Sequence, residues 1–250
     1  MIHRIKWLTS RAGRSQPRFF LAFPLILTAA ALLFFVLMFP RETSSNALKL
    51  YSFFKSRPQV QPPAAPLPDP ASFDGRKALE EVSRFLAVGP RCSGAAGAGR
   101  AAEYIAGRLK EFGIEPITDE FKDATPEGER IFRNVMGELP GQKDSVIILL
   151  SHYDTKHGIS LDFSGANDSG SSTGLLLELA RVLKQFKQDG ATIFLAFLDG
   201  EECLKEYGPH DGLHGSRRLA STLIRNMRAS KVTAVIVLDM VGDANLNIGI

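Results

Sequence analysis

Cysteine is scarce in this chain of 250 residues, where only Cys92 and Cys203 occur. Two cysteines are too few for a disulfide framework, and their separation does not match the spacing of a cysteine-based metal site. No internal repeat is apparent either, which argues against a repeat architecture. With 44% hydrophobic residues, the length allows one substantial core and no more than two domains.

Acidic residues are missing from the start of the chain. None precedes Glu42, whereas five basic residues come before an apolar run: Arg4, Lys6, Arg11, Arg14 and Arg18. The whole chain has 30 Lys and Arg against 27 Asp and Glu, a formal net charge of +3. Without those five bases the acids are in slight excess. This balance provides no basic surface, so we expect no nucleic-acid partner.

The run from Phe20 to Phe39 contains no charged residue, and about 20 apolar residues suffice to cross a membrane. With the basic residues before it and only Arg41 soon after, the positive-inside rule predicts a cytoplasmic tail over 1–19 and a transmembrane signal anchor over 20–39. The rest would then be extracytoplasmic, periplasmic or extracellular. A cleavable signal peptide is the alternative, with Ser45-Asn46-Ala47 as cleavage site, but its apolar region is usually roughly 7–15 residues.

Residues 40–71 are rich in proline, which indicates a semi-rigid linker, and a folded domain is expected over 72–250. Apolar periodicity predicts four helices in it, over 78–88, 101–112, 175–186 and 216–227. Five strands are predicted, over 116–122, 130–138, 145–151, 191–198 and 232–240. The last three are apolar throughout, as interior parallel strands are. This order predicts an α/β fold, a three-layer sandwich around a mostly parallel mixed sheet.

Acidic and imidazole side chains follow the three interior strands. His152 and Asp154 follow the first, Glu201 and Glu202 the second, and Asp239 lies near the end of the third. In an open α/β sheet the carboxyl ends of the strands form the ligand-binding edge. Clustered carboxylates repel each other unless a cation lies among them, and zinc suits mixed imidazole and carboxylate ligands. The sequence therefore predicts a metal site at this edge.

Each of these groups also has a structural interpretation. His152 and Asp154 alone are typical of a hydrogen-bonded histidine at a strand end. Asp168 precedes the helix expected over 175–186 and would serve there as an N-cap. The pair of glutamates alone would indicate an exposed acidic loop, although an apolar strand leads directly into it. For Asp239 the functional interpretation is favoured, because burying an unpaired carboxylate in an apolar run is costly.

Together, His-x-Asp, Asn-Asp-Ser-Gly, Asp-Gly-Glu-Glu and Leu-Asp-Met resemble, in this order, metallopeptidase family 28 over residues 76–250. The resemblance implies a fold of the zinc-exopeptidase type. It implies four zinc ligands, His152, Asp168, Glu202 and Asp239. It also implies that Glu201 is the catalytic general base and that Asp154 orients the histidine.

The segment 199–220 is similar to the glutaminyl-peptide cyclotransferases of that family, with Tyr207 where those enzymes place a tryptophan beside the substrate. This implies cyclisation of N-terminal glutamine on peptides by one zinc, held by Asp168, Glu202 and a further His. Glu201 would carry the proton, and Asp239 would share it. The alternative is a two-zinc aminopeptidase acting on peptide N-termini, in which His152 and Asp239 hold the second zinc and Asp168 bridges.

The family's last zinc ligand is a His well after the strand matching 232–240, and none follows that strand here. We therefore expect a domain that lacks its C-terminal part, and a 250-residue chain that is itself inactive. His210 or His214 as substitute ligand is an alternative, and so is an ectodomain that has lost its activity.

Overall fold

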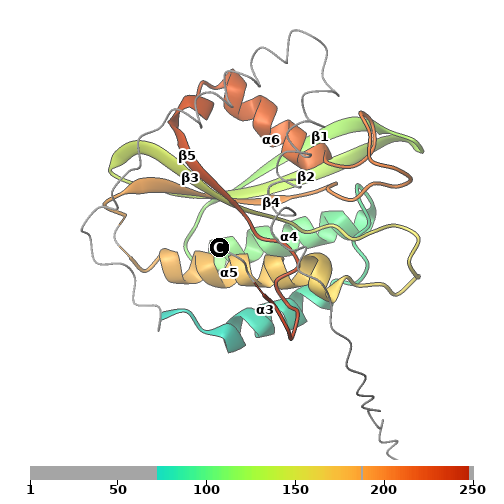
Figure 1. Cartoon of the computed structure of the whole chain (residues 1–250), viewed down its shortest axis with the longest axis horizontal. Helices are drawn as coiled ribbons and strands as arrows, with labels where there is room; N and C mark the ends of the chain where they lie inside the picture. Colours follow the sequence, from blue (N-terminus) through green and yellow to red (C-terminus); the bar gives the residue numbers. More distant parts are fainter. Residues whose placement is uncertain (1–71, 187, 248–250) are drawn as a thin grey trace, which may run out of the picture. The chain divides into compact units, whose positions relative to one another are not determined.

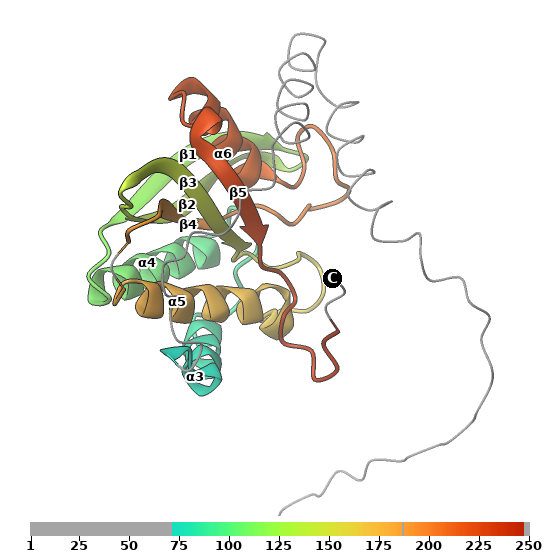
Figure 2. The same cartoon turned by 60° about the vertical axis from the view of Figure 1, so that its left-hand side comes forward.

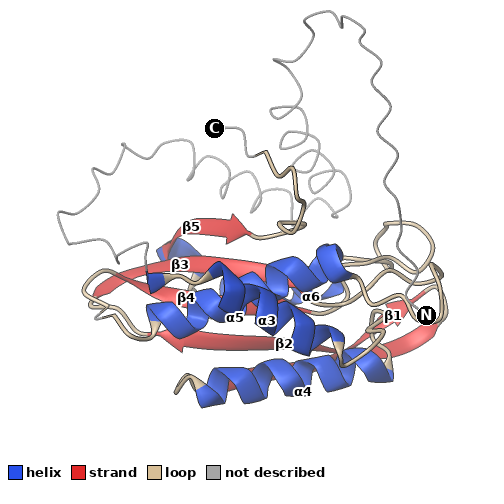
Figure 3. Cartoon of the chain, turned by 90° about the horizontal axis from the view of Figure 1, so that it is seen from below, coloured by secondary structure: helices blue, strands red, loops and turns tan. Residues whose placement is uncertain are grey.

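A mixed five-stranded sheet forms the centre of the part of the chain that the computed structural model describes, residues 72–186 and 188–247. The strand order is β1-β2-β4-β3-β5, and the views of Figures 1 and 3 show the strands side by side. The bounds are β1 Pro116–Thr125, β2 Gly128–Leu139, β3 Lys143–His152, β4 Ala191–Leu198 and β5 Val232–Val237.

The strand directions divide the sheet into two parts. β3 pairs in parallel with both β4 and β5, whereas β1 with β2 and β2 with β4 are antiparallel. Only residues 126–127 separate β1 from β2, a connection that permits a hairpin but no parallel crossover. The expected mixed sheet is therefore confirmed, with parallel pairing among the three strands that precede the acidic groups and antiparallel pairing for β1 and β2.

Helices cover both faces of the sheet, as the predicted three-layer arrangement requires. α4 (Ala96–Glu111) and α5 (Ser172–Leu183) lie on one face, α3 (Gly75–Leu86) packs against α5, and α6 (His214–Arg225) lies on the opposite face (Figure 1). Two short elements, η2 (Ala166–Ser171) and η3 (Ala229–Lys231), precede α5 and β5. The larger core includes Phe85, Ile105 and Leu195, and the smaller one, under α6, includes Phe194 and Leu219.

α4 begins at Ala96, before the predicted start at 101. Gly97 lies in its first turn and weakens the helical pattern of the sequence. The glycine is required by packing, because a Cβ there would lie 2.0 Å from the carbonyl oxygen of Pro90. The helix therefore contacts the turn at 89–91 directly. At its other end, Gly113 has a φ of +75° and provides the expected helix stop.

β5 differs most from its prediction as an interior strand over 232–240. It ends at Val237, and within the described residues it is an edge strand (Figure 2). Its side chains are correspondingly exposed, with Val235 at 47%, Ile236 at 46% and Val237 at 64%. The strand is apolar as predicted, but among the described residues it has no neighbour on its outer side. Asp239 lies beyond the strand.

Among the residues that the structure describes, we find no helix that combines the length and the apolar character of a membrane span. The predicted cytoplasmic tail (1–19), anchor (20–39) and linker (40–71) lie outside the described residues. They stay predictions.

The contact between α3 and α5 leads to a stability prediction. A Cβ on Gly174 would lie 2.5 Å from Val82 Cγ2 and 2.9 Å from the Ala78 carbonyl oxygen. Gly174→Ala should therefore force the helices apart and lower the free energy of unfolding by about 1–3 kcal/mol. Gly107→Ala on α4, where no atom lies within 4 Å of the added methyl group, should instead raise it by about 0.5–1 kcal/mol. Urea unfolding measures both, and equal effects would contradict this account of the α3–α5 contact.

Candidate metal centre

The predicted site residues converge at the carboxyl ends of the three parallel strands. His152 is the last residue of β3, Glu201 and Glu202 follow β4 through Asp199-Gly200, and Asp239 follows β5. Asp168 comes from η2, which leads into α5. The topology thus brings residues that are up to 87 positions apart, as His152 and Asp239 are, to one edge of the sheet.

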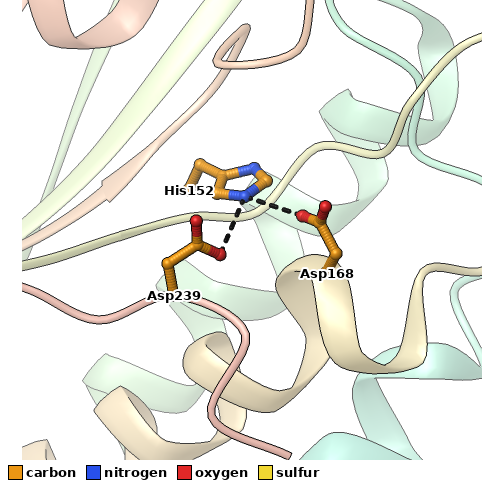
Figure 4. Close-up of side chains that lie close together, drawn as sticks. All are labelled: His152, Asp168 and Asp239. Atoms are coloured by element: carbon orange, nitrogen blue, oxygen red, sulfur yellow. Dashed lines mark ion pairs between the residues drawn. The ribbon is translucent and has the colours of Figure 1, made fainter. Parts of the chain in front are cut away.

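Three of these side chains form a compact cluster around the His152 imidazole. Its Nε2 lies 3.0 Å from Asp168 Oδ1 and 3.5 Å from Asp239 Oδ1 (Figure 4). One ligand atom of each of the three residues lies within 4.8 Å of the other two. One imidazole nitrogen and two carboxylate oxygens at this separation are a donor set that zinc accepts.

Asp154 contacts the His152 ring at Nδ1, whereas Asp168 and Asp239 lie at Nε2. Asp154 is fully buried, and its Oδ1 lies 3.4 Å from His152 Nδ1. The backbone N–H groups of Glu201 and Glu202 donate to the same carboxylate at 3.1 and 3.0 Å, and the Ser93 hydroxyl donates at 2.7 Å. Burial alone would raise the pKa of Asp154, but the hydrogen bonds outweigh it and hold the pKa below its usual value. A charged Asp154 therefore orients the imidazole, as the resemblance implies, and also holds the glutamate pair.

The charges around His152 favour a cation at the cluster. Burial lowers the pKa of the His152 imidazole, but its hydrogen bonds to Asp154, Asp168 and Asp239 outweigh this and raise the pKa to about 12. The Asp239 pKa is lowered, chiefly by its hydrogen bond to His152. The carboxylates that stabilise a proton on Nε2 also favour a metal ion in the same place, because the proton and the metal ion are both positively charged.

Two structural interpretations from the sequence can now be judged. Ser171, not Asp168, is the N-cap residue of α5, and the Asp168 carboxylate contacts His152 instead. Among the described residues the Asp239 side chain is 50% exposed beyond the end of β5, so it is less buried than its apolar neighbours in the sequence suggested. The contact between Asp239 and His152 is nevertheless present.

Glu201 and Glu202 lie at the same edge but have different surroundings. The Tyr207 hydroxyl lies 3.3 Å from an oxygen of each carboxylate. Burial, followed by nearby carboxylates, raises the pKa of Glu201 to about 7, although the charge of His152 opposes this. Burial and then the charge of Asp168 raise the Glu202 pKa too. A carboxyl that titrates near neutrality suits a proton carrier.

Lys156 is a functional candidate that the sequence analysis did not identify. Its Nζ lies 3.3 Å from Glu202 Oε2 and 2.9 Å from the Cys203 carbonyl oxygen, and 5.4 Å from the ring centroid of Tyr207. Glu202 therefore pairs with Lys156 and stays outside the three-residue cluster. The only signal in the sequence was the closeness of Lys156 to the His-x-Asp pair, which does not reveal a partner 46 residues away.

The loop that carries Tyr207 is held by two sets of hydrogen bonds, one to backbone carbonyl groups and one to the Asp211 carboxylate. The N–H groups of residues 213–215, at the start of α6, donate to the carbonyl oxygens of residues 201, 200 and 199. Asp211, which is buried, accepts from the N–H groups of Leu204, Lys205 and Glu206 at 2.6–3.0 Å. Burial acts to raise the Asp211 pKa, but these three donors outweigh it and lower the pKa.

Neither alternative histidine belongs to the metal cluster in the described part of the chain. His214 Nδ1 lies 2.8 Å from Asp123 Oδ2 on β1, and its ring stacks on Phe132 at 4.3 Å between centroids. His210 is exposed on the loop. The structure thus gives no support to either as a substitute ligand.

Comparison with known proteins agrees with this geometry. Residues 134–250, which contain all the clustered side chains, match the family model described as peptidase family M28. Over this segment the chain resembles peptidase family M28. Among relatives, a glutaminyl-peptide cyclotransferase of Drosophila melanogaster is 31% identical over 168 residues, which cover 65% of this chain and 47% of that protein. The chain thus spans about half the length of the curated relative.

Two solved structures of similar fold extend the comparison. A glutaminyl cyclase from an Acidobacteriales bacterium has a TM-score of 0.68 and 35% identity, over 76% of this chain and 65% of that one. A Zn-dependent exopeptidase from Parabacteroides distasonis has a TM-score of 0.56 and 29% identity, over 69% of this chain and 63% of that one. The chain is therefore similar in fold both to a glutaminyl cyclase and to an exopeptidase.

The lowered pKa of Asp211 predicts how the Tyr207 loop depends on pH. Asp211→Asn should lower the free energy of unfolding by about 1–3 kcal/mol near pH 7, because the charged acceptor of three N–H groups is lost. A group whose pKa is lowered by folding stabilises the protein above its unfolded pKa and loses that effect as the pH falls. The deficit should therefore shrink below about pH 4.

Urea unfolding across this pH range measures the effect. Asp144→Asn, the same change at an exposed carboxylate paired with Lys231, should alter the free energy of unfolding by less than about 0.5 kcal/mol. A deficit for Asp211→Asn that stays constant down to pH 3 would show that the charge is not the cause.

Proposed function

We propose that this protein is a zinc-dependent glutaminyl-peptide cyclotransferase, which converts N-terminal glutamine of peptides to pyroglutamate and releases ammonia. The observation that carries the proposal is the placement of Glu201 and Glu202 beside the His152–Asp168–Asp239 cluster. The likeness to cyclotransferases in sequence and in fold supports it. Because the chain spans about half of the curated relatives' length, the activity of the whole protein rests on this proposal.

Zinc fits the residues that are present. Of the ligands implied for a one-zinc cyclotransferase, Asp168 and Glu202 are present, and a further His would complete them. The cluster of His152, Asp168 and Asp239 also offers three donor atoms, and the hydrogen bond between Asp154 and Nδ1 leaves Nε2 directed at the two carboxylates. Glu202 lies beside them as a further carboxylate donor and is the ligand that the resemblance implies. When bound, zinc acts as a Lewis acid that polarises the γ-carbonyl group of the substrate glutamine.

The protein's own residues move the proton. Glu201 accepts a proton from the substrate α-amine, whose nitrogen then forms a bond to the γ-carbonyl carbon. As the bond from that carbon to the side-chain amide nitrogen breaks, Glu201 returns the proton to the leaving nitrogen, which departs as ammonia. Asp239 shares the proton by hydrogen bonding, and the exposed Tyr207 ring forms a wall for the substrate.

A two-zinc aminopeptidase is the second candidate, and one observation favours it. The cluster that the structure assembles, His152, Asp168 and Asp239, is the set that the two-metal interpretation assigns to its second zinc. One protein of similar fold is described as a Zn-dependent exopeptidase. In this interpretation Glu201 takes its proton from water instead of from the substrate amine.

Removal of one ligand tests the metal centre. Asp168→Ala should lower zinc content at least about tenfold after dialysis, because Asp168 is a ligand in both interpretations. Asp144→Ala is the matched control, since Asp144 lies near the opposite end of β3 from His152. Elemental analysis measures both variants. Zinc bound equally by the parent and by Asp168→Ala would refute the assignment.

Two substrates separate the two activities. A peptide with N-terminal glutamine and a leucine anilide are offered to the zinc-loaded domain in a form that includes the family's last His ligand, because the 250-residue chain itself is expected to be inactive. A cyclotransferase releases ammonia from the first and leaves the second intact, whereas release of the anilide with about two zinc ions bound identifies the aminopeptidase. Glu201→Gln should lower the turnover number by about 10²–10⁴-fold, because the proton carrier is lost while its shape is kept. An active Glu201→Gln variant would contradict both mechanisms.

A further inference from the structure

We propose that Arg91 is a positioning residue for the metal ligands, which ties the backbone after His152 to the backbone before Asp168. The inference rests on the proposed metal centre, and it assigns a role to a side chain outside that centre.

Arg91 is a fully buried cation. None of its surface is exposed, and its guanidinium lies 4.4 Å from the centroid of the Phe85 ring. Burial lowers its pKa to about 10, although the charge of Asp154 opposes this. In the described part of the chain, the guanidinium forms no ion pair within 4.0 Å and donates to backbone carbonyl groups instead. Burying a charge without an ionic partner is costly, and these hydrogen bonds offset part of that cost.

The carbonyl groups that it reaches belong to two ligand-bearing segments. Nε donates at 2.8 Å to the carbonyl oxygen of Tyr153, the residue between His152 and Asp154. Nη1 donates to Ser164 at 2.7 Å, and Nη2 lies 3.4 Å from the Gly165 carbonyl oxygen, directly before η2. One planar side chain therefore connects the end of β3 with the start of the segment that carries Asp168.

The backbone of Arg91 adds to the same connection. Its carbonyl oxygen accepts from the Thr155 N–H at 3.1 Å, and its own N–H donates to the Thr155 hydroxyl at 3.1 Å. The turn itself is fixed from the other side, because α4 approaches Pro90 closely at Gly97. Arg91 thus has a rigid base from which to hold both segments.

The position of Gly165 determines that of Asp168. Gly165 has a φ of +53°, and a Cβ on it would lie 2.2 Å from the Asp168 carbonyl oxygen. Its carbonyl oxygen, which Arg91 approaches, also accepts from the Gly170 N–H at 2.9 Å. A shift of Gly165 would therefore move the Asp168 carboxylate away from His152 Nε2, which lies only 3.0 Å away.

Arginine is suited to this role and lysine is not. A guanidinium presents five N–H donors in a fixed plane and can bond several carbonyl groups in different directions. A lysine keeps the positive charge but concentrates its donors at one atom. Arg91→Lys therefore removes the multiple connection and retains the buried charge.

The test compares Arg91→Lys with Arg108→Lys in the full 250-residue chain. Arg108 is also a largely buried arginine, but it bonds Glu81 between α4 and α3, away from the metal ligands. Zinc affinity is measured by competition with a chelator, and hydrogen exchange of residues 153–168 is measured in the metal-free protein. Arg91→Lys should weaken zinc binding about 10–100-fold, the usual effect of losing a residue that orients ligands. It should also speed exchange in that segment.

Arg108→Lys should change the melting temperature and leave both readouts as in the parent. The proposal is overturned if Arg91→Lys lowers the melting temperature while zinc affinity and exchange stay at parental values, because Arg91 would then be only structural. If the parent itself does not bind zinc, the proposed metal centre is refuted. The role of Arg91 is then judged by hydrogen exchange alone, and unchanged exchange of residues 153–168 in Arg91→Lys would refute it.

A milder variant covers the case in which Arg91→Lys does not fold. Thr155→Val removes the hydroxyl that accepts from the Arg91 N–H and keeps the shape of the side chain. It should change zinc affinity and exchange in the same direction by a smaller factor. Parental values for both would overturn the assignment of Arg91.

Discussion

The buried carboxylate of Asp154 is the point on which the whole site depends. It accepts hydrogen bonds from Ser93, from the His152 ring and from the backbone N–H groups of Glu201 and Glu202. A single charge thus sets the ring orientation of His152, the proposed metal ligand, and the position of Glu201, the proposed proton carrier. A buried carboxylate is tolerated only with such a set of donors. Loss of its charge would therefore disturb both functions together.

The same edge of the sheet concentrates negative charge and partly compensates it. Asp199, which is fully buried beside Asp154, has a pKa raised to about 8 by burial and then by the charge of that neighbour. The half-buried Lys156 pairs with Glu202, and Arg91 supplies a buried cation behind the proposed ligands. The carboxylates of Asp168 and Asp239 are compensated by the proton on His152 Nε2, which is the place where a metal ion is proposed to bind instead.

Strand and helix order could be predicted from the sequence, whereas the end of β5 and the side-chain partners could not. The alternation of strands and helices correctly predicted three layers, and β4 was predicted with its observed bounds. The positions of His152, Glu201 and Glu202 relative to strand ends followed from the same reasoning. β5 ends three residues before its predicted end at 240, because apolar composition does not show where a strand stops. Asp239 therefore lies beyond the strand, half exposed near His152 within the described part of the chain.

By itself, the sequence determined which acidic and imidazole groups lie at the carboxyl edge of the sheet, because residues that directly follow a parallel strand lie at that edge. It also indicated the family through the order of these groups. Only the tertiary structure decided their partners: Asp154 with the Glu201 and Glu202 amides, Lys156 with Glu202, and Arg91 with the carbonyl groups before Asp168. These contacts depend on strand order and loop paths. Residue periodicity carries no information about either, because it reports only which side of its own element a side chain occupies.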